Sequence, residues 1–146
     1  MKNRWQAVPR PHHGGTNMKR SLDIAAIVLT SLLLLGFAVL SVRGFIDPQP
    51  ASARFGIQVS DAAGALFYRV YLSRNLVIAA SGAIFLLTRQ WTPLAVILTV
   101  CATLPLFDMS FLSLSGVTPP ALHPVALALI ILSAGLMWRR ALPTRA

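Results

Sequence analysis

Charged residues are scarce in this chain of 146 residues, and acidic residues are the scarcest of them. Only 12% of the residues are charged, and four aspartates supply all of the negative charge because the chain has no glutamate. Soluble proteins carry about 25% charged residues, so this composition excludes most soluble enzymes. A single cysteine, Cys101, excludes a disulfide scaffold within the chain.

Apolar residues are abundant instead, at 55% of the chain, and the mean hydropathy is +0.68. A chain this short cannot bury so much apolar surface in one core and still keep a wettable exterior. It also has too much apolar surface to be disordered. The composition therefore predicts a small integral membrane protein, whose main partner is the lipid bilayer.

The net charge of +9 raises the question of a nucleic-acid partner. The basic residues cluster at the ends of apolar runs, where they orient helices in a bilayer. They form no stripe interleaved with aromatic residues of the kind that binds single strands. We therefore expect no nucleic-acid partner.

Four apolar runs follow a polar, basic N-terminal stretch. The first run, residues 22–42, spans roughly 31 Å as a helix, close to the hydrocarbon thickness of about 30 Å. It is longer than the apolar region of a signal peptide, so we expect it to be retained. Because short connections make consecutive helices antiparallel, we expect an all-α fold, an antiparallel four-helix transmembrane bundle. The predicted segments are a mobile basic tail at 1–20, a transmembrane domain at 21–140 with helices at about 22–42, 65–87, 92–114 and 121–138, and a basic cytoplasmic end at 141–146.

The first connection carries the signals of a short helix. Asp47 stands at an N-cap position, Pro48 at the first helical position and Gly56 at a helix end. These residues predict a helix from Pro48 to Phe55 that lies at the membrane surface.

The distribution of Lys and Arg predicts the orientation. Five lie in the N-terminal tail, one in the second connection and three at the C-terminus, whereas only Arg43 and Arg54 lie in the connections of the other side. Trp91 and Trp138 also fall at the more basic side, where indole rings favour the membrane interface. We expect a multi-pass protein of the cell inner (plasma) membrane with both termini in the cytoplasm.

Two arginines interrupt the second apolar run. Arg69 is near its outer edge and can extend to the headgroups, but Arg74 is near the midplane, where a guanidinium costs about 2.5–3.5 kcal/mol. We expect Arg74 to point inward and to form an ion pair with Asp108 of the third run, at a similar depth. Asn75 adds an amide beside Arg74, while His123 and Arg43 enter at the outer ends of their runs.

Two interpretations of this polar set are open. It is either a network that locks the helices together or an outward-facing polar pocket, since intramembrane ionisable groups often mark functional sites. The pocket candidates are Arg74, Asn75, Asp108, His123 and Arg43. No spacing of metal ligands, nucleotide-binding loop or cofactor fingerprint is present, so we expect no metal and no cofactor.

The order of these residues resembles the small four-helix membrane proteins of the domain-of-unknown-function family numbered 4267. The residues that carry the resemblance are Arg43, Pro48, Phe55–Gly56, Arg74–Asn75, Gly82, Pro105, Asp108, Gly116 and His123. It covers residues 22–140 and implies a four-helix membrane fold with an Arg/Asp/His set near one face. The family pattern has Arg–Asp where this chain has Arg74–Asn75, and His–Gly where it has His123–Pro124. The first departure removes a carboxylate beside Arg74 and weakens any role that needs two acids.

The favoured function is a non-enzymatic membrane protein whose outward-facing pocket, with Arg74, Asp108 and His123, binds a small hydrophobic or anionic molecule, a lipid or a partner helix. One alternative is a small membrane enzyme of isomerase or hydrolase type that acts on a hydrophobic substrate. It would use Asp108 and His123 for proton transfer and Arg74 as the electrophile. Another alternative is a transport accessory subunit.

Overall fold

The computed structural model describes residues 14–142, which form six helices and no strand. They are α1 (Gly14–Ile46), α2 (Pro48–Phe55), α3 (Ala62–Leu87), α4 (Trp91–Cys101), α5 (Thr103–Leu114) and α6 (Leu122–Ala141). Four stretches are long and apolar enough to cross a membrane: Asn17–Ile46, Ala62–Leu87, Trp91–Leu114 and Leu122–Ala141. The predicted all-α fold, with four long apolar helices and a short helix after the first, is confirmed.

The first helix is longer than predicted at both ends. It begins at Gly14, so residues 14–20, which were assigned to a mobile tail, are helical. Residues 1–13 of that predicted tail, and residues 143–146 of the predicted C-terminal segment, lie outside the described residues. At its other end α1 continues past Arg43 to Ile46, and it ends there because Pro48 disfavours a helical conformation at the preceding residue.

The short helix α2 has the predicted bounds, but its N-terminus is built differently from the expectation. Pro48 occupies the start of the helix as predicted, whereas the side chain of Asp47 makes no capping hydrogen bond. Gly56 ends the helix in the left-handed conformation, at φ 115°, and its N–H bonds back to the carbonyls of Ser52 and Ala53. The buried Ser52 hydroxyl donates to the Gln49 carbonyl and accepts from the Val59 N–H, which fixes α2 to the connection that follows it.

The third apolar run is two helices rather than one. α4 ends at Cys101 and α5 begins at Thr103, with a turn at Ala102 between them. Pro105 explains the break, because it has no N–H to donate to the Cys101 carbonyl and its ring crowds that carbonyl.

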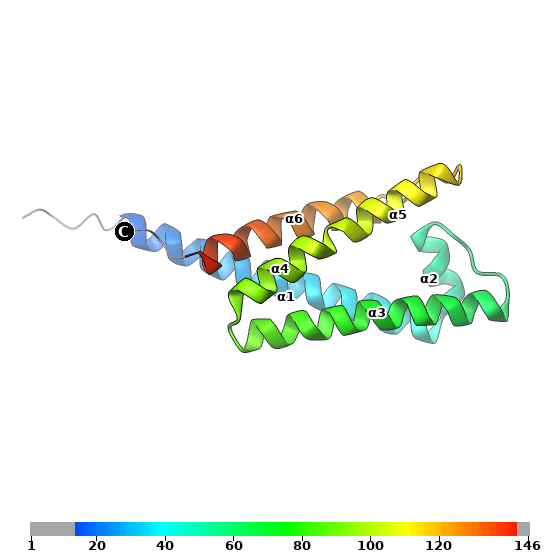
Figure 1. The fold of residues 1–146 in the computed structure, drawn as a ribbon, viewed down its shortest axis with the longest axis horizontal. Coiled ribbons are helices and arrows are strands. Elements are labelled where there is room, and N and C mark those ends of the chain that lie inside the picture. The colour runs from blue at the N-terminus through cyan, green and yellow to red at the C-terminus, as the bar shows by residue number, and fades with distance from the viewer. Residues whose placement is uncertain (1–13, 143–146) are drawn as a thin grey trace, which may run out of the picture.

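The helices pack tightly at one end of the molecule and separate at the other. The chain runs out along α1, back along α3, out along α4 and α5 and back along α6, and α5 diverges from α3 toward the end where α2 lies (Figure 1). α1 packs mainly against α3, and α4 mainly against α6. The buried apolar cluster lies at the tightly packed end and consists of Ala26, Leu94, Ala95, Leu98, Ala134 and Met137.

The outer surface of the bundle is apolar. Large side chains such as Leu32, Phe67 and Ile131 are more than half exposed along all the long helices. A protein surrounded by water exposes few contiguous apolar patches of this extent, whereas lipid tails solvate such a surface. The exposure pattern therefore agrees with a helical bundle that spans a membrane.

Candidate functional site

A cavity of about 400 Å³ lies where α5 diverges from α3. Its walls come from α1, α2, α3, α5 and α6, and most of the lining side chains are apolar. The lining residues with polar groups are Ser41, Arg43, Asp47, Arg54, Tyr68, Tyr71, Asn75, Asp108 and His123. Ligand pockets in proteins have the same character, with apolar walls and a few placed polar groups, and begin at about 300 Å³.

His123 is buried in the wall of this cavity, with 3% of its surface exposed. Its Nε2 lies 2.9 Å from the carbonyl oxygen of Phe55, at the end of α2. Since a carbonyl can only accept a hydrogen bond, Nε2 must carry a proton and donate it. The Phe55 ring also meets the imidazole edge to face, with centroids 4.7 Å apart. His123 thus connects α6 to α2.

Asp108 faces the other ring nitrogen of His123. Its Oδ2 lies 3.7 Å from Nδ1, which is an ion-pair distance and too long for a direct hydrogen bond. Because Nε2 donates to the Phe55 carbonyl, Nδ1 is the ring nitrogen that faces the carboxyl group of Asp108. Asp108 is partly exposed to the cavity, so its carboxyl group is within reach of a bound molecule.

An aromatic wall on α3 completes the cavity. Tyr68 stacks on Tyr71 with centroids 6.1 Å apart, and Tyr71 meets the Phe55 ring at 5.6 Å. Sequence reasoning missed these tyrosines. The sequence did contain a pattern that could have identified them. The spacing of three and four residues places Tyr68 and Tyr71 on the same helix face as the predicted pocket residue Asn75.

The structure does not place Arg74 with the other predicted site residues. Its side chain is exposed, it does not line the cavity, and among residues 14–142 it forms no ion pair with Asp108. The structure therefore does not contain the predicted Arg74–Asp108 pair, and the ion-pair partner of Asp108 is His123. The reason is helix rotation: α3 buries Leu72, Ala79 and Gly82, and Arg74 lies about 200° around the helix from Leu72.

The remaining predicted pocket residues do line the cavity. Asn75 and Arg43 join Asp108 and His123 there, and Arg54 and Asp47 add charged groups that were not among the predicted pocket residues. Arg43, Arg54 and Asp47 are exposed, so they belong to the mouth of the cavity rather than to its floor. Arg69, which was expected to extend to the headgroups, donates instead from Nε to the Phe45 carbonyl of α1 at 3.1 Å.

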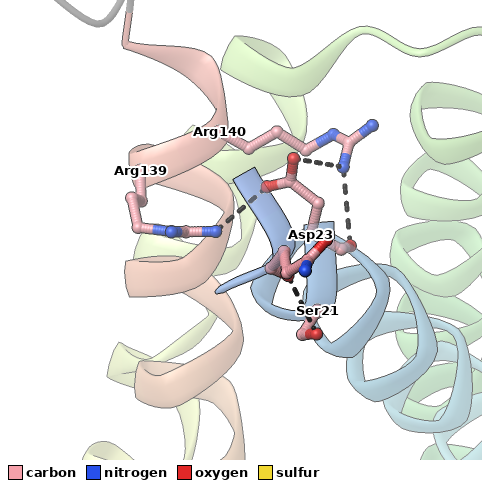
Figure 2. Close-up of polar contacts among 5 residues, drawn as sticks. Ser21, Asp23, Arg139 and Arg140 are labelled. Atoms are coloured by element: carbon pink, nitrogen blue, oxygen red, sulfur yellow. Dashed lines mark hydrogen bonds and ion pairs between the residues drawn. The ribbon is translucent and has the colours of Figure 1, made fainter. Parts of the chain in front are cut away.

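A second polar cluster lies at the opposite, tightly packed end of the bundle. Asp23 of α1 accepts from Arg139 of α6 at 3.0 Å, and Arg140 lies 3.8 Å from the other carboxylate oxygen (Figure 2). These ion pairs join the first and last long helices, α1 and α6.

The model of the family described as "Domain of unknown function (DUF4267)" matches residues 35–138. The match covers well over half of the chain and includes the residues that line the cavity. The chain belongs to this family. No curated protein and no solved structure matched.

Within this DUF4267 protein, the two polar regions differ in their relation to the family domain. The cavity, from Phe37 to Ile130, lies inside the matched residues. Asp23, Arg139 and Arg140 lie outside them, so the cluster at the tightly packed end is a feature of this chain next to the family domain.

Proposed function

We propose that this protein binds a small amphiphilic molecule in the cavity bounded by α1, α2, α3, α5 and α6, within a membrane. The observation that carries the proposal is the Asp108–His123 pair, which holds polar atoms against a space with otherwise mainly apolar walls. A structural network would pack its polar groups against one another, whereas here the partly exposed Asp108 borders about 400 Å³ of open space.

The lining indicates the chemistry of the ligand. Apolar side chains and the rings of Tyr68 and Tyr71 favour a hydrocarbon or ring portion. The Asp108–His123 pair and Asn75 favour a hydroxyl or carbonyl group, and the cationic side chains at the mouth favour an anionic group there. The volume suits a molecule of drug-like size better than a partner helix, whose diameter alone is about 10 Å.

One observation, the Asp108–His123 pair beside the cavity, also supports the alternative of a membrane enzyme. An imidazole paired with a carboxylate beside a cavity is a common arrangement for general acid–base catalysis. The residue proposed as its electrophile, Arg74, is exposed and does not line the cavity, however. A membrane isomerase or hydrolase would now have to rely on the cations of the mouth, so binding is the better supported function.

We also propose that the protein lies in the plasma membrane with both termini in the cytoplasm. The support is the concentration of Lys and Arg at the tightly packed end, which includes Arg20, Arg89 and Arg139. The cavity mouth would then open toward the outer side of the membrane.

The proposal is tested by filling the cavity without disturbing its polar pair. Ala126 lines the cavity on α6, whereas Ala128 on the same helix is exposed on the outer surface. The wild type, Ala126→Trp and Ala128→Trp are purified in mild detergent, and their bound small molecules are extracted and compared by mass spectrometry. We expect a species that is retained by the wild type and by Ala128→Trp and is absent from Ala126→Trp. The same extract from all three proteins would contradict ligand binding in this cavity.

The same extracts separate a binder from an enzyme. The purified wild type is incubated with the extracted species, and its mass is followed over time. An unchanged species supports binding, whereas conversion to a product that requires Asp108 would assign the catalytic alternative.

A further inference from the structure

A second candidate site lies at the end of the bundle opposite the cavity. An open hollow of about 410 Å³ there is lined by Lys19, Arg20, Asp23, Ile24, Ile27 and Arg140. The ligand proposed for the cavity does not involve these residues. The hollow combines cations from the first and last helices with an apolar strip.

Ion pairs hold the cations of α6 in place at this hollow. Asp23 accepts from Arg139 at 3.0 Å and lies 3.8 Å from the Arg140 guanidinium, and both arginines reach toward it from α6 (Figure 2). The Arg140 guanidinium also lies 4.2 Å from the centroid of the Trp91 ring. Within residues 14–142, this cluster brings together four cationic side chains, those of Lys19, Arg20, Arg139 and Arg140, and one carboxylate, that of Asp23.

The hollow lies where the chain changes from polar to apolar. Lys19 and Arg20 immediately precede the apolar part of α1, and Arg139 and Arg140 follow the apolar part of α6. Trp91 begins α4 at the same end, and its contact with Arg140 places an indole beside the hollow. In membrane proteins this combination of cations and indole rings falls at the depth of the lipid headgroups.

We propose that this hollow binds the phosphate of an anionic glycerophospholipid, with the acyl chains lying along α1. The cations of Lys19, Arg20 and Arg140 suit a phosphate group, because each donates hydrogen bonds and carries charge. Ile24 lines the same hollow, is 54% exposed and offers an apolar surface to the chains. A free phosphate would use the cations but gain nothing from that surface, so the geometry favours the lipid.

The test measures which lipids lie next to the indole rings of this end. Trp5→Phe leaves Trp91 and Trp138 as the only tryptophans of the full chain. This protein is reconstituted into vesicles of zwitterionic phosphatidylcholine that contain brominated phosphatidylglycerol or brominated phosphatidylcholine, and tryptophan quenching reports the relative affinity of the two lipids. We expect a preference for phosphatidylglycerol, of about fivefold for each cation that contacts the phosphate.

Matched variants show where the preference arises. In the Trp5→Phe background, the double variant Lys19→Gln/Arg20→Gln removes two cations that line the hollow. The single variant Arg20→Gln replaces it if the double variant folds poorly. Arg89→Gln removes an exposed cation from the α3–α4 connection that does not line the hollow. The preference should fall in the first two variants and persist in the third.

Three results would overturn the proposal. One is equal quenching by both lipids in the protein with intact cations. Another is an equal loss of preference in Arg89→Gln, which would indicate general surface charge. The third is displacement of brominated phosphatidylglycerol by soluble glycerol phosphate, which would assign the hollow to a free phosphate.

Discussion

His123 connects three elements of the structure through its two ring nitrogens. It belongs to α6, its Nε2 bonds to the last carbonyl of α2, and its Nδ1 faces Asp108 of α5. The Phe55 carbonyl is one of the groups at a helix end that lack a partner within the helix. Loss of the imidazole would therefore leave both this carbonyl and the Asp108 carboxylate without their partner.

We predict that His123→Leu lowers the free energy of unfolding by about 1–3 kcal/mol, the usual effect of leaving buried polar groups unsatisfied. Adding Asp108→Leu should restore part of the loss, because the double variant leaves no unpaired carboxylate beside the cavity. Unfolding of the detergent-solubilised variants with increasing SDS measures these changes. Simple additivity of the two single variants would show that the residues do not interact.

Arg74 shows where the residue-level reasoning from sequence failed. That reasoning placed the guanidinium inside the bundle because it is costly in lipid, but cost alone does not determine the rotation of a helix. The small residues Ala79 and Gly82 share a face with Leu72 and pack toward α1, where a Cβ on Gly82 would meet the Leu34 side chain at 2.6 Å. Close packing on this face directs Arg74 to the opposite side.

We predict that Arg74→Leu leaves the stability of the detergent-solubilised protein within about 0.5 kcal/mol of the wild type, as for other surface substitutions. The same SDS titration is used, with Asp108→Leu as the comparison that should destabilise. A large loss of stability in Arg74→Leu would instead indicate that Arg74 forms an ion pair with Asp108.

At the level of elements, α2 was predictable and the partners of its ends were not. Pro48 and Gly56 act through the local backbone, so the sequence alone located both ends of this helix. The contact of Phe55 with His123 joins residues 68 positions apart, and no local pattern encodes it. The break between α4 and α5 has a local cause in Pro105, but its consequence, the separation of α5 from α3, depends on packing.

Gly56, the residue that ends α2, is predicted to tolerate an added Cβ poorly. Its φ of 115° strains any residue with a Cβ, and a Cβ there would lie 3.2 Å from Pro120 and 3.3 Å from Leu112. We expect Gly56→Ala to lower the free energy of unfolding by about 1–2 kcal/mol from the backbone alone, with a further loss from these contacts.

Gly116→Ala is the matched control for this prediction. Gly116 also has a positive φ, of 76°, but a Cβ there would have no neighbour within 4 Å. Gly56→Ala should therefore be the more destabilising of the two in the same titration. Equal losses would indicate that α2 does not pack closely against Leu112 and Pro120.

At the scale of the whole molecule, the sequence was enough to predict an all-α membrane protein. Composition and the lengths of the apolar runs do not depend on how the helices pack. The same properties could not locate the cavity, which arises from tight packing of one end of the bundle and divergence of α5 from α3 at the other (Figure 1). Four of the five predicted pocket residues nevertheless line it, namely Arg43, Asn75, Asp108 and His123. Their similar depth was predictable because depth along a membrane helix can be counted from sequence, whereas the direction of a side chain around the helix cannot.

The proposed orientation predicts which connections are reachable from outside the cell. In a Cys101→Ser background, Ser60→Cys in the α2–α3 connection should react with a membrane-impermeant maleimide on intact cells. Arg89→Cys in the α3–α4 connection should react only after permeabilisation, because it lies at the end that we place in the cytoplasm. The reverse labelling pattern would invert the proposed orientation.

The central claim, that Asp108 and His123 form the polar end of a ligand cavity, is tested most directly by an experimental density map. The full chain would be crystallised from a lipidic phase after mild extraction from its own membrane. We predict non-protein density between α3 and α5 that contacts Asp108 or His123, with His123 Nε2 bonded to the Phe55 carbonyl. A cavity closed by protein side chains, or an Asp108 turned away from His123, would contradict the account.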